Sequence, residues 1–217
     1  MKKTVEYVWI DGTPLSSQVR SKTRVLDEFE SPKDWNFDGG STYQGTLEDS
    51  DVILHPVRTY RDPFRREGEN FIALCEVRNT DSTPHSTNFR AELVTQCNLP
   101  VTKDSQPLFG FEQEYTLIGP EGPLETKNPT QAYCGVGNSK VKGRELAEAH
   151  LQACMYAGVG MYGINAEVLI GQWEFQTSPM DPVQASDDLW MARYILERLS
   201  EDVNNPYSVS FAPKPVI

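Results

Sequence analysis

Four glutamates lie in two short segments that are otherwise apolar and aromatic. Glu112 and Glu114 are two residues apart in GFEQEYTL, so on a β-strand their side chains point to the same face. Glu167 and Glu174 are seven apart in INAEVLIGQWEFQ, and a turn or bulge near Gly171 would bring both onto one face of a hairpin. Carboxylates gathered on one face repel one another unless cations lie among them, and oxygen ligands favour hard divalent ions. The spacing therefore predicts a site for Mg²⁺ or Mn²⁺.

The plainer interpretation of a Glu-X-Glu pair is a solvated face of an edge strand. The neighbouring residues favour buried strands instead, and glutamates are rarely buried without a partner. The large apolar residues in or beside the two segments are Phe109, Phe111, Tyr115, Leu117, Trp173 and Phe175. The occurrence of two such segments therefore favours a carboxylate metal site.

Composition sets limits on the partners and the compartment. The 217 residues are enough for one large domain or two small ones, and the net charge of −11 argues against nucleic acid as a partner. No apolar stretch follows the Met-Lys-Lys start and no run approaches ~18 apolar residues, so we expect neither a secretory signal nor a membrane span. The four cysteines show no CxxC spacing, which indicates reduced thiols in a cytoplasmic protein.

The first part of the chain reads as a small β-rich domain. Alternating and β-branched patterns predict strands at residues 4–10, 17–26, 51–57 and 71–77, with a loop at 35–45. The connection at 82–88 is the expected link to the second domain.

The second part alternates strands and helices. We expect a strand at GFEQEYTL, a Gly/Pro-rich hairpin at 119–129, a helix over 144–157, and the glutamate-bearing hairpin. A further helix is predicted from an N-cap at Ser186, and a last strand at YSVSF. His150 lies within the first of these helices, where a structural or surface role is more common than metal ligation.

In their order, these segments resemble the eukaryotic-type (type II) glutamine synthetases, from about Val8 to Pro215. The segments that carry the resemblance are WIDG, RSKTR, WNFDGGST, YRDPFRRE, LCEV, FGFEQEYTL, YCGVGNSKVKGRE, EAHLQACMYAGV, INAEVLIGQWEFQ, LWMARYILER and FAPKP. The resemblance implies an α+β fold with an N-terminal β-grasp domain at residues 1–86. A partial catalytic domain at 87–217 would come next, built on a curved antiparallel sheet with helices.

The resemblance also implies a reaction and an assembly. The family joins ammonia to L-glutamate, using ATP, through a γ-glutamyl phosphate to give L-glutamine. Two divalent ions, Mg²⁺ or Mn²⁺, serve that chemistry by neutralising phosphate charge. Type II enzymes are homo-oligomers, decamers of two pentameric rings with active sites shared between subunits.

Matching the family's motifs assigns roles to particular residues. Glu112 would hold the metal nearer ATP, and Glu114, Glu167 and Glu174 the metal nearer glutamate. Beyond these, the resemblance gives ATP contacts to Glu112, Glu174, Phe175, Gln176, Thr177, Ser178 and Pro179.

Asp38 matches the aspartate that helps to bind ammonium and accept its proton. In the family this loop completes the neighbouring subunit's site, so we expect Asp38 to lie far from the glutamates of its own chain. Two residues depart from the family's pattern. Gly40 stands where the family has serine in Asp-Gly-Ser-Ser, and Ser178 stands where it has glycine before a proline.

The chain ends at Ile217, where the family continues into a glycine-rich ATP motif with a metal-binding histidine, then substrate-binding arginines and a further metal glutamate. Nothing in the sequence given takes those roles, so we expect these 217 residues alone to be incomplete and not to form glutamine at a useful rate. Two alternatives stay open: a non-catalytic glutamine-synthetase-like protein, and a ligase that joins glutamate to another amine.

Overall fold

The computed structural model describes residues 1–46, 48–124 and 132–212, and it has the mixed α+β character expected from the sequence. The chain divides into two compact units. The first comprises Met1–Pro107 with Asp181–Asp187, and the second comprises Leu108–Met180 with Asp188–Ile217. The predicted domain boundary between residues 86 and 87 stays a prediction, since compactness groups residues up to 107 with the first unit.

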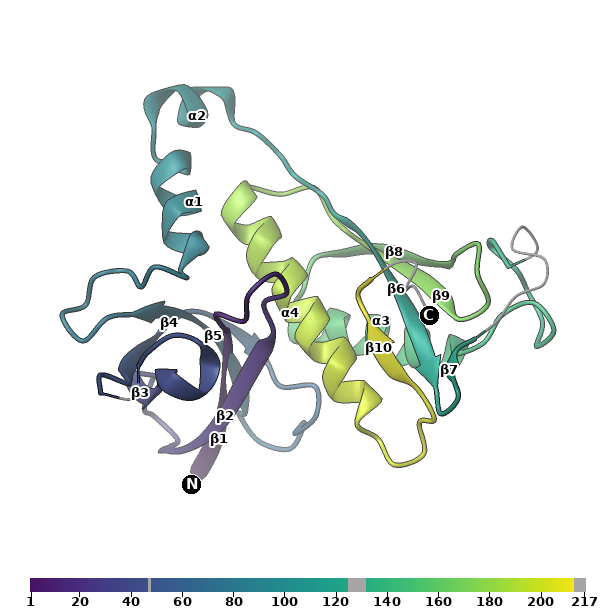
Figure 1. Cartoon of the computed structure of the whole chain (residues 1–217), viewed down its shortest axis with the longest axis horizontal. Coiled ribbons are helices and arrows are strands. Elements are labelled where there is room, and N and C mark those ends of the chain that lie inside the picture. The colour runs from purple at the N-terminus through teal and green to yellow at the C-terminus, as the bar shows by residue number, and fades with distance from the viewer. Residues whose placement is uncertain (47, 125–131, 213–217) are drawn as a thin grey trace. The chain divides into compact units, whose positions relative to one another are not determined.

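The first unit is built on one five-stranded sheet, with the strand order β2-β1-β5-β4-β3 (Figure 1). β1 pairs antiparallel with β2 and parallel with β5, while β4 pairs antiparallel with both β5 and β3. The strands are β1 (Lys2–Ile10), β2 (Val19–Asp27), β3 (Trp35–Asp38), β4 (Asp51–Arg61) and β5 (Phe71–Arg78). The four predicted strands are confirmed. The loop prediction for residues 35–45 was wrong at its start, because the aromatic residues of WNFD form β3 against β4.

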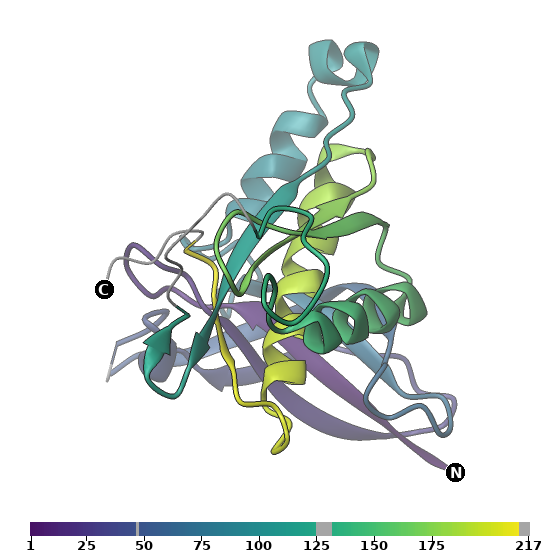
Figure 2. The same ribbon diagram turned by 90° about the vertical axis from the view of Figure 1, so that its right-hand side faces the viewer.

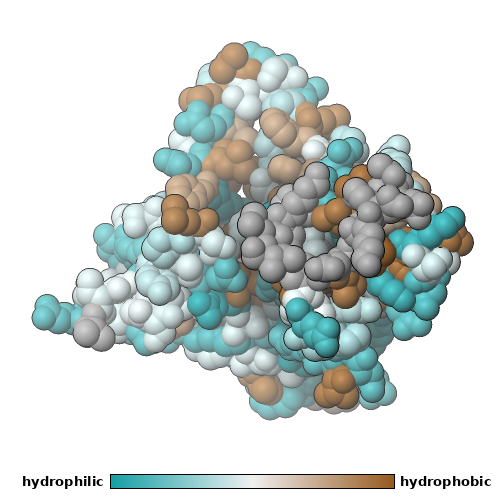
Figure 3. Space-filling view, turned by 45° about the vertical axis from the view of Figure 1, so that its right-hand side comes forward, coloured by the Kyte–Doolittle hydropathy of each residue, from teal (hydrophilic) through white to brown (hydrophobic). Residues whose placement is uncertain are grey.

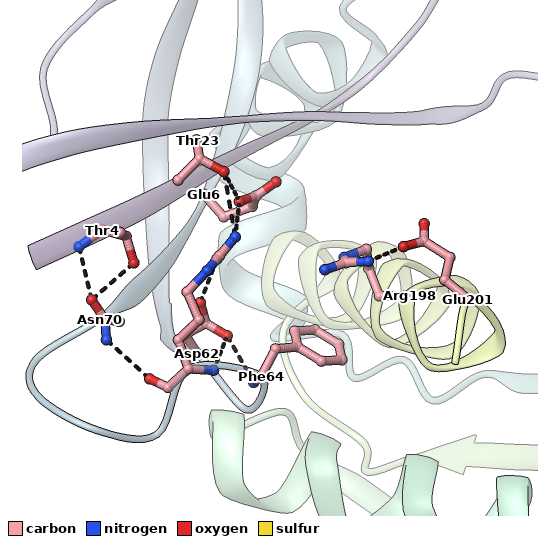
Figure 4. A network of polar contacts seen from close by, with 9 residues as sticks. Thr4, Glu6, Thr23, Asp62, Phe64, Asn70, Arg198 and Glu201 are labelled. Carbon is pink, nitrogen blue, oxygen red and sulfur yellow. Dashed lines mark hydrogen bonds and ion pairs between the residues drawn. The ribbon is translucent and has the colours of Figure 1, made fainter. Parts of the chain in front are cut away.

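Aromatic pairs fill the core of this sheet. Tyr7 meets Trp35 edge-on with ring centroids 5.2 Å apart, and Trp9 packs against Phe37 at 4.8 Å. Because β1 is central, it is buried on both faces and even Glu6 is only 5% exposed. A buried carboxylate needs charged or hydrogen-bonding partners, and Glu6 accepts from Thr23 and from Arg65 (Figure 4).

The same arginine closes the long connection between β4 and β5. Arg65 Nη1 donates to Asp62 Oδ2 at 2.8 Å, and the backbone amide of Phe64 donates to Asp62 Oδ1. Asn70 accepts from both the amide and the hydroxyl of Thr4 at 2.8 Å (Figure 4). The charged residues of YRDPFRRE therefore serve to fasten this loop to the sheet.

Two short helices follow the sheet: α1 (Phe89–Cys97) and α2 (Pro100–Ser105). Asn88 caps α1 by accepting from the amide of Ala91 at 3.0 Å. Neither this cap nor α2, which begins at a proline, was predicted. Neither helix has a buried residue, and apolar side chains such as Phe89 and Val101 are largely exposed there. Hydrophobic residues lie among hydrophilic ones on the surface seen in Figure 3.

The second unit contains an antiparallel sheet with the order β10-β6-β9-β8, and β7 pairs with β6 beside this path. Helices α3 and α4 lie near the sheet (Figure 2). The elements are β6 (Glu112–Gly119), β7 (Gly122–Pro123), α3 (Arg144–Ala157), β8 (Met161–Ala166), β9 (Gln172–Thr177), α4 (Pro182–Ser200) and β10 (Ser208–Ser210). The start of the predicted 119–129 hairpin is described and pairs β6 with β7, whereas its residues 125–129, like residues 213–215 of FAPKP, lie outside the described residues.

Helix α3 spans the predicted residues and ends at Gly158, which adopts the left-handed conformation. Helix α4 begins earlier than predicted, at Pro182, so Ser186 lies inside it and is not its N-cap. Asp181 takes that place, since its Oδ1 accepts from the amides of Val183 and Gln184. Proline is compatible with the first helical position, which explains the earlier start.

Candidate metal and nucleotide site

Strand pairing brings three of the four glutamates to one face of the second sheet. In the antiparallel register, Glu114 lies opposite Glu174, and Glu112 lies opposite Gln176. Residues directly opposite each other share a face, and so do residues two apart on one strand. Glu112, Glu114 and Glu174 therefore point to the same side, as the two-residue spacing predicts.

Glu167 reaches this face from the turn that joins β8 to β9. Its neighbour Asn165 pairs with Glu174 in the sheet, and Asn165 Nδ2 donates to Glu167 Oε1 at 3.1 Å. The turn depends on Gly171, whose φ of 79° is favourable only without a side chain. A Cβ there would lie 2.7 Å from Leu124 Cδ1. The glycine thus turns the chain as expected, although Glu167 follows β8 rather than standing on a strand.

Amide side chains lie between the glutamates on this face. Gln172 Nε2 donates to Glu114 Oε2 at 2.6 Å. Gln176 Nε2 donates to Glu174 Oε1, and also to Asn165 Oδ1 at 2.6 Å. Sequence reasoning missed Asn165 and Gln172, and it considered Gln176 only as part of an ATP-contacting stretch. A signal was available in the spacing. Asn165 is two residues before Glu167, and Gln172 and Gln176 are two residues on either side of Glu174, which on a strand places each on the face of its glutamate.

The electrostatics of the face follow from this crowding. Partial burial raises the pKa of Glu174, and the negative charges of Glu112, Glu167 and Glu114 raise it further, against the hydrogen bond from Gln176. The other three carboxylates therefore all act on Glu174, even Glu112, which is exposed.

The donor set suits a hard divalent cation, because it consists of carboxylates whose mutual repulsion a cation would relieve. Among the described residues, no three His, Cys, Asp or Glu side chains form a ready-made ligand cluster. Instead, the side-chain amides of Gln172, Gln176 and Asn165 donate hydrogen bonds to oxygens of Glu114, Glu174 and Glu167, respectively. Residues that would hold a cation here are Glu112, Glu114, Glu167 and Glu174.

The opposite face of the sheet is buried and rigidly packed. Trp173 and Phe175 are at most 1% exposed, and the His150 ring meets Phe175 at 5.0 Å. His150 Nε2 lies 2.9 Å from the carbonyl oxygen of Ala192, which joins α3 to α4. This burial lowers the pKa of His150 to about 4. His150 is therefore a structural histidine, as the sequence favours.

Arg193 of α4 supports the strand of Glu112 and Glu114 from this buried side. Its Nε donates to Gln113 Oε1 at 2.8 Å, and its guanidinium lies over the rings of Trp190 and Phe211. Gln113 stands between the two glutamates in sequence and faces the other way. The arginine thereby fixes the backbone that presents both carboxylates.

The stretch after Glu174, predicted to contact ATP, is already well paired. Phe175 is fully buried on the helix side, and Thr177 exchanges hydrogen bonds with the backbone of Phe111. The Ser178 amide donates to Gly160 O at 2.8 Å, and its hydroxyl donates to Met161 O at 3.1 Å. Pro179 is exposed. The role of this stretch toward ATP stays a prediction.

Asp38 belongs to the first unit, where it caps the 3₁₀ turn Gly39–Thr42. Its carboxylate accepts from the Ser41 hydroxyl at 2.7 Å and from the Gly40 amide at 3.0 Å, and these bonds lower its pKa. A Cβ at Gly40 would lie 3.2 Å from Asp38 Oδ1, so the family's serine would crowd the carboxylate. The structure thus shows an exposed, ionised carboxylate, while its predicted role and its distance from the glutamates stay predictions.

No helix in the described ranges is both long and apolar enough to cross a membrane.

Comparison with known proteins identifies relatives for both units. Residues 1–80 match the family "Glutamine synthetase, beta-Grasp domain". The chain is 43% identical to a glutamine synthetase of Candida glabrata and 44% identical to one of Suillus bovinus, over 99% of this chain in each case. It is 41% identical to the glutamine synthetase cytosolic isozyme 1-3 of Arabidopsis thaliana, again over 99% of its own length. It spans 59%, 62% and 63% of these three relatives.

The aligned region therefore covers both sheets, including the glutamate face and the Asp38 turn. The chain is thus similar to glutamine synthetases along almost all of its own length, and its first 80 residues match the β-grasp domain of that family.

Proposed function

We propose that this chain serves the ATP-dependent ligation of ammonia to L-glutamate, which proceeds through a γ-glutamyl phosphate to L-glutamine. The observation that supports this most directly is the convergence of four glutamates from β6, β9 and the β8–β9 turn. A ligase that uses ATP needs such a carboxylate site, because divalent cations neutralise the phosphates during transfer.

The residues divide the work between two cations of Mg²⁺ or Mn²⁺. Glu112 holds the cation nearer ATP, while Glu114, Glu167 and Glu174 hold the cation nearer glutamate. When bound, the cations supply charge neutralisation for the phosphates. The chain's own contribution is to hold the carboxylates oriented and on one side of the sheet.

The remaining roles concern the nucleotide and ammonia. The backbone from Phe175 to Pro179 contacts ATP beside Glu112 and Glu174. Asp38, kept ionised by Ser41 and Gly40, attracts ammonium and accepts its proton in a site completed by a neighbouring subunit. The assembly proposed is the type II decamer of two pentameric rings, in the cytoplasm.

Nucleotide binding that depends on a cation is the test of this proposal. The purified chain is titrated with a non-hydrolysable ATP analogue by calorimetry, with and without Mn²⁺. We expect binding that requires Mn²⁺ and that Glu112→Gln weakens at least tenfold. Glu148→Gln, an exposed glutamate on α3, is the control and should bind as the wild type does. Absence of binding, or binding indifferent to Mn²⁺, would contradict the proposal.

A further inference from the structure

Gln172 is the most deeply buried polar side chain on the glutamate face. It is 1% exposed, although it stands at the first position of β9, next to the turn. Its two ends have different partners. The Nε2 group donates to Glu114 Oε2 at 2.6 Å, and Oε1 accepts from the Leu169 amide at 3.1 Å. One side chain therefore joins β6 to the β8–β9 turn.

The backbone of Gln172 closes the same turn. Its carbonyl oxygen accepts from the Glu167 amide at 2.9 Å, and its amide donates to Leu169 O at 3.0 Å. Glu167 is thus held at its own backbone by the residue whose side chain holds Glu114. A displacement of Gln172 would move both glutamates together.

We propose that Gln172 is a positioning residue that sets the Glu114 carboxylate and the Glu167 turn in one fixed arrangement for cation binding. The inference rests on the proposed function, since it concerns the same cation site. It adds a residue that would touch neither cation nor substrate. Residues that hydrogen-bond metal ligands commonly change metal affinity by about 10–100-fold when they are replaced.

The chemistry of the amide suits this task. A carboxylate that accepts a charge-assisted hydrogen bond has one oxygen oriented, while its other oxygen is left for a cation. Because an amide is neutral, it orients Glu114 without adding charge to a face that already carries four carboxylates. Replacing the amide with a side chain of equal length and no hydrogen-bonding group would leave Glu114 free to rotate.

The test measures Mn²⁺ affinity, with free Mn²⁺ counted by electron paramagnetic resonance. The variants are Gln172→Met, Glu114→Ala and the double variant, all in the full 217-residue chain. Gln152→Met, an exposed glutamine on α3, is the matched control. If circular dichroism shows that Gln172→Met does not fold, Gln172→Asn replaces it, because the shorter amide cannot span both partners.

We expect Gln172→Met to weaken Mn²⁺ binding at least tenfold and Gln152→Met to leave it unchanged. In the Glu114→Ala background the same change should cost clearly less than in the wild-type background, because the part of the loss that acts through Glu114 is already gone and only the part through the Leu169 amide and the Glu167 turn remains. Wild-type affinity in Gln172→Met, or a full additional loss in the Glu114→Ala background, would overturn the inference alone. A wild-type chain that binds no Mn²⁺ would overturn the proposed function, and this inference with it.

Discussion

The Asp38 turn and the glutamate face hold their carboxylates by different means. Asp38 accepts hydrogen bonds from residues two and three positions along the chain, and it is exposed. Glu114 accepts a hydrogen bond from Gln172, which lies 58 positions away. Glu174 stands on β9, which is paired with β6 on one side and β8 on the other. The first arrangement is local and the second requires the whole sheet.

The charges differ in the same way. Hydrogen bonds from Ser41, Gly40 and Ser50 lower the pKa of Asp38, so its ionised form is favoured by residues close to it in the chain. Burial and three neighbouring carboxylates raise the pKa of Glu174, so its ionised form is disfavoured without a counter-ion. The comparison shows that the Asp38 turn favours a charged carboxylate by itself, whereas the glutamate face favours one only when positive charge is near.

The largest expected effect breaks the glutamate face. Glu174→Gln removes one anionic ligand, so we expect Mn²⁺ affinity to fall on the order of 10²–10³-fold. Electron paramagnetic resonance of free Mn²⁺ measures this, with Glu148→Gln as the control of equal charge change. Unchanged affinity in Glu174→Gln would remove Glu174 from the cation site.

The same variant has a pH signature without metal. Since the pKa of Glu174 is raised above 4.5, its contribution to stability is present below that pH and is lost as the pH rises through the folded-state pKa. We therefore expect metal-free Glu174→Gln to lose less stability than the wild type over that rise. Urea unfolding at a series of pH values measures the difference.

The next prediction concerns His150, which is buried behind the sheet that carries the glutamates. The turn at the exposed Asp38 has no counterpart to this buried histidine among the described residues. The pKa of His150 is lowered from 6.5 to about 4, so its contribution to stability is present above pH 6.5 and is lost as the pH falls toward 4. The loss should be on the order of 3 kcal/mol at full extent. In His150→Gln, unfolding free energy should change less over this range. Parallel pH curves for the two proteins would show that His150 is accessible to protons in the folded state.

A smaller effect tests how the Asp38 turn is anchored. Gln44 is 2% exposed, and its side chain bonds Ile10 O, the Thr87 hydroxyl and the Thr42 hydroxyl. Gln44→Met removes these buried hydrogen bonds, although the Thr42 and Thr87 hydroxyls keep partners in Gly39 O and His85 Nδ1, and we expect a loss of about 1–3 kcal/mol in unfolding free energy. Gln18→Met, at an exposed position, is the control. Equal stability of both variants would mean that the turn needs no tertiary anchor.

The smallest effect sharpens the comparison at Asp38 itself. Removing the hydroxyl in Ser41→Ala should raise the pKa of Asp38 toward 3.8, because that bond is the largest cause of its lowering. Stability from Asp38 is present above 3.8 and is lost as the pH falls through its folded pKa, so the variant should lose it at higher pH. Carboxylate titration by NMR measures the shift, and Ser16→Ala should leave it unchanged.

The sequence by itself determined most of the strands and helices. It also determined that Glu112 and Glu114 point to the same face of their strand. The alternation in GFEQEYTL and the left-handed glycine at 171 follow from backbone geometry, which neighbouring residues decide. The Asn88 cap is local in the same sense, since its partner is three residues away, although it was not predicted. The start of α4 was predicted wrongly although its signal is also local, since Asp181 can cap a helix and the proline that follows it suits the first helical position.

Only the tertiary structure decided which residues lie between the carboxylates. Nothing in the spacing shows that Gln172 binds Glu114, because strand register is set by pairing between segments some sixty residues apart. The same holds for Arg193, which reaches Gln113 from a distant helix. The sequence determines which side chains can share a face, whereas the partners that orient them depend on long-range pairing that no local pattern encodes.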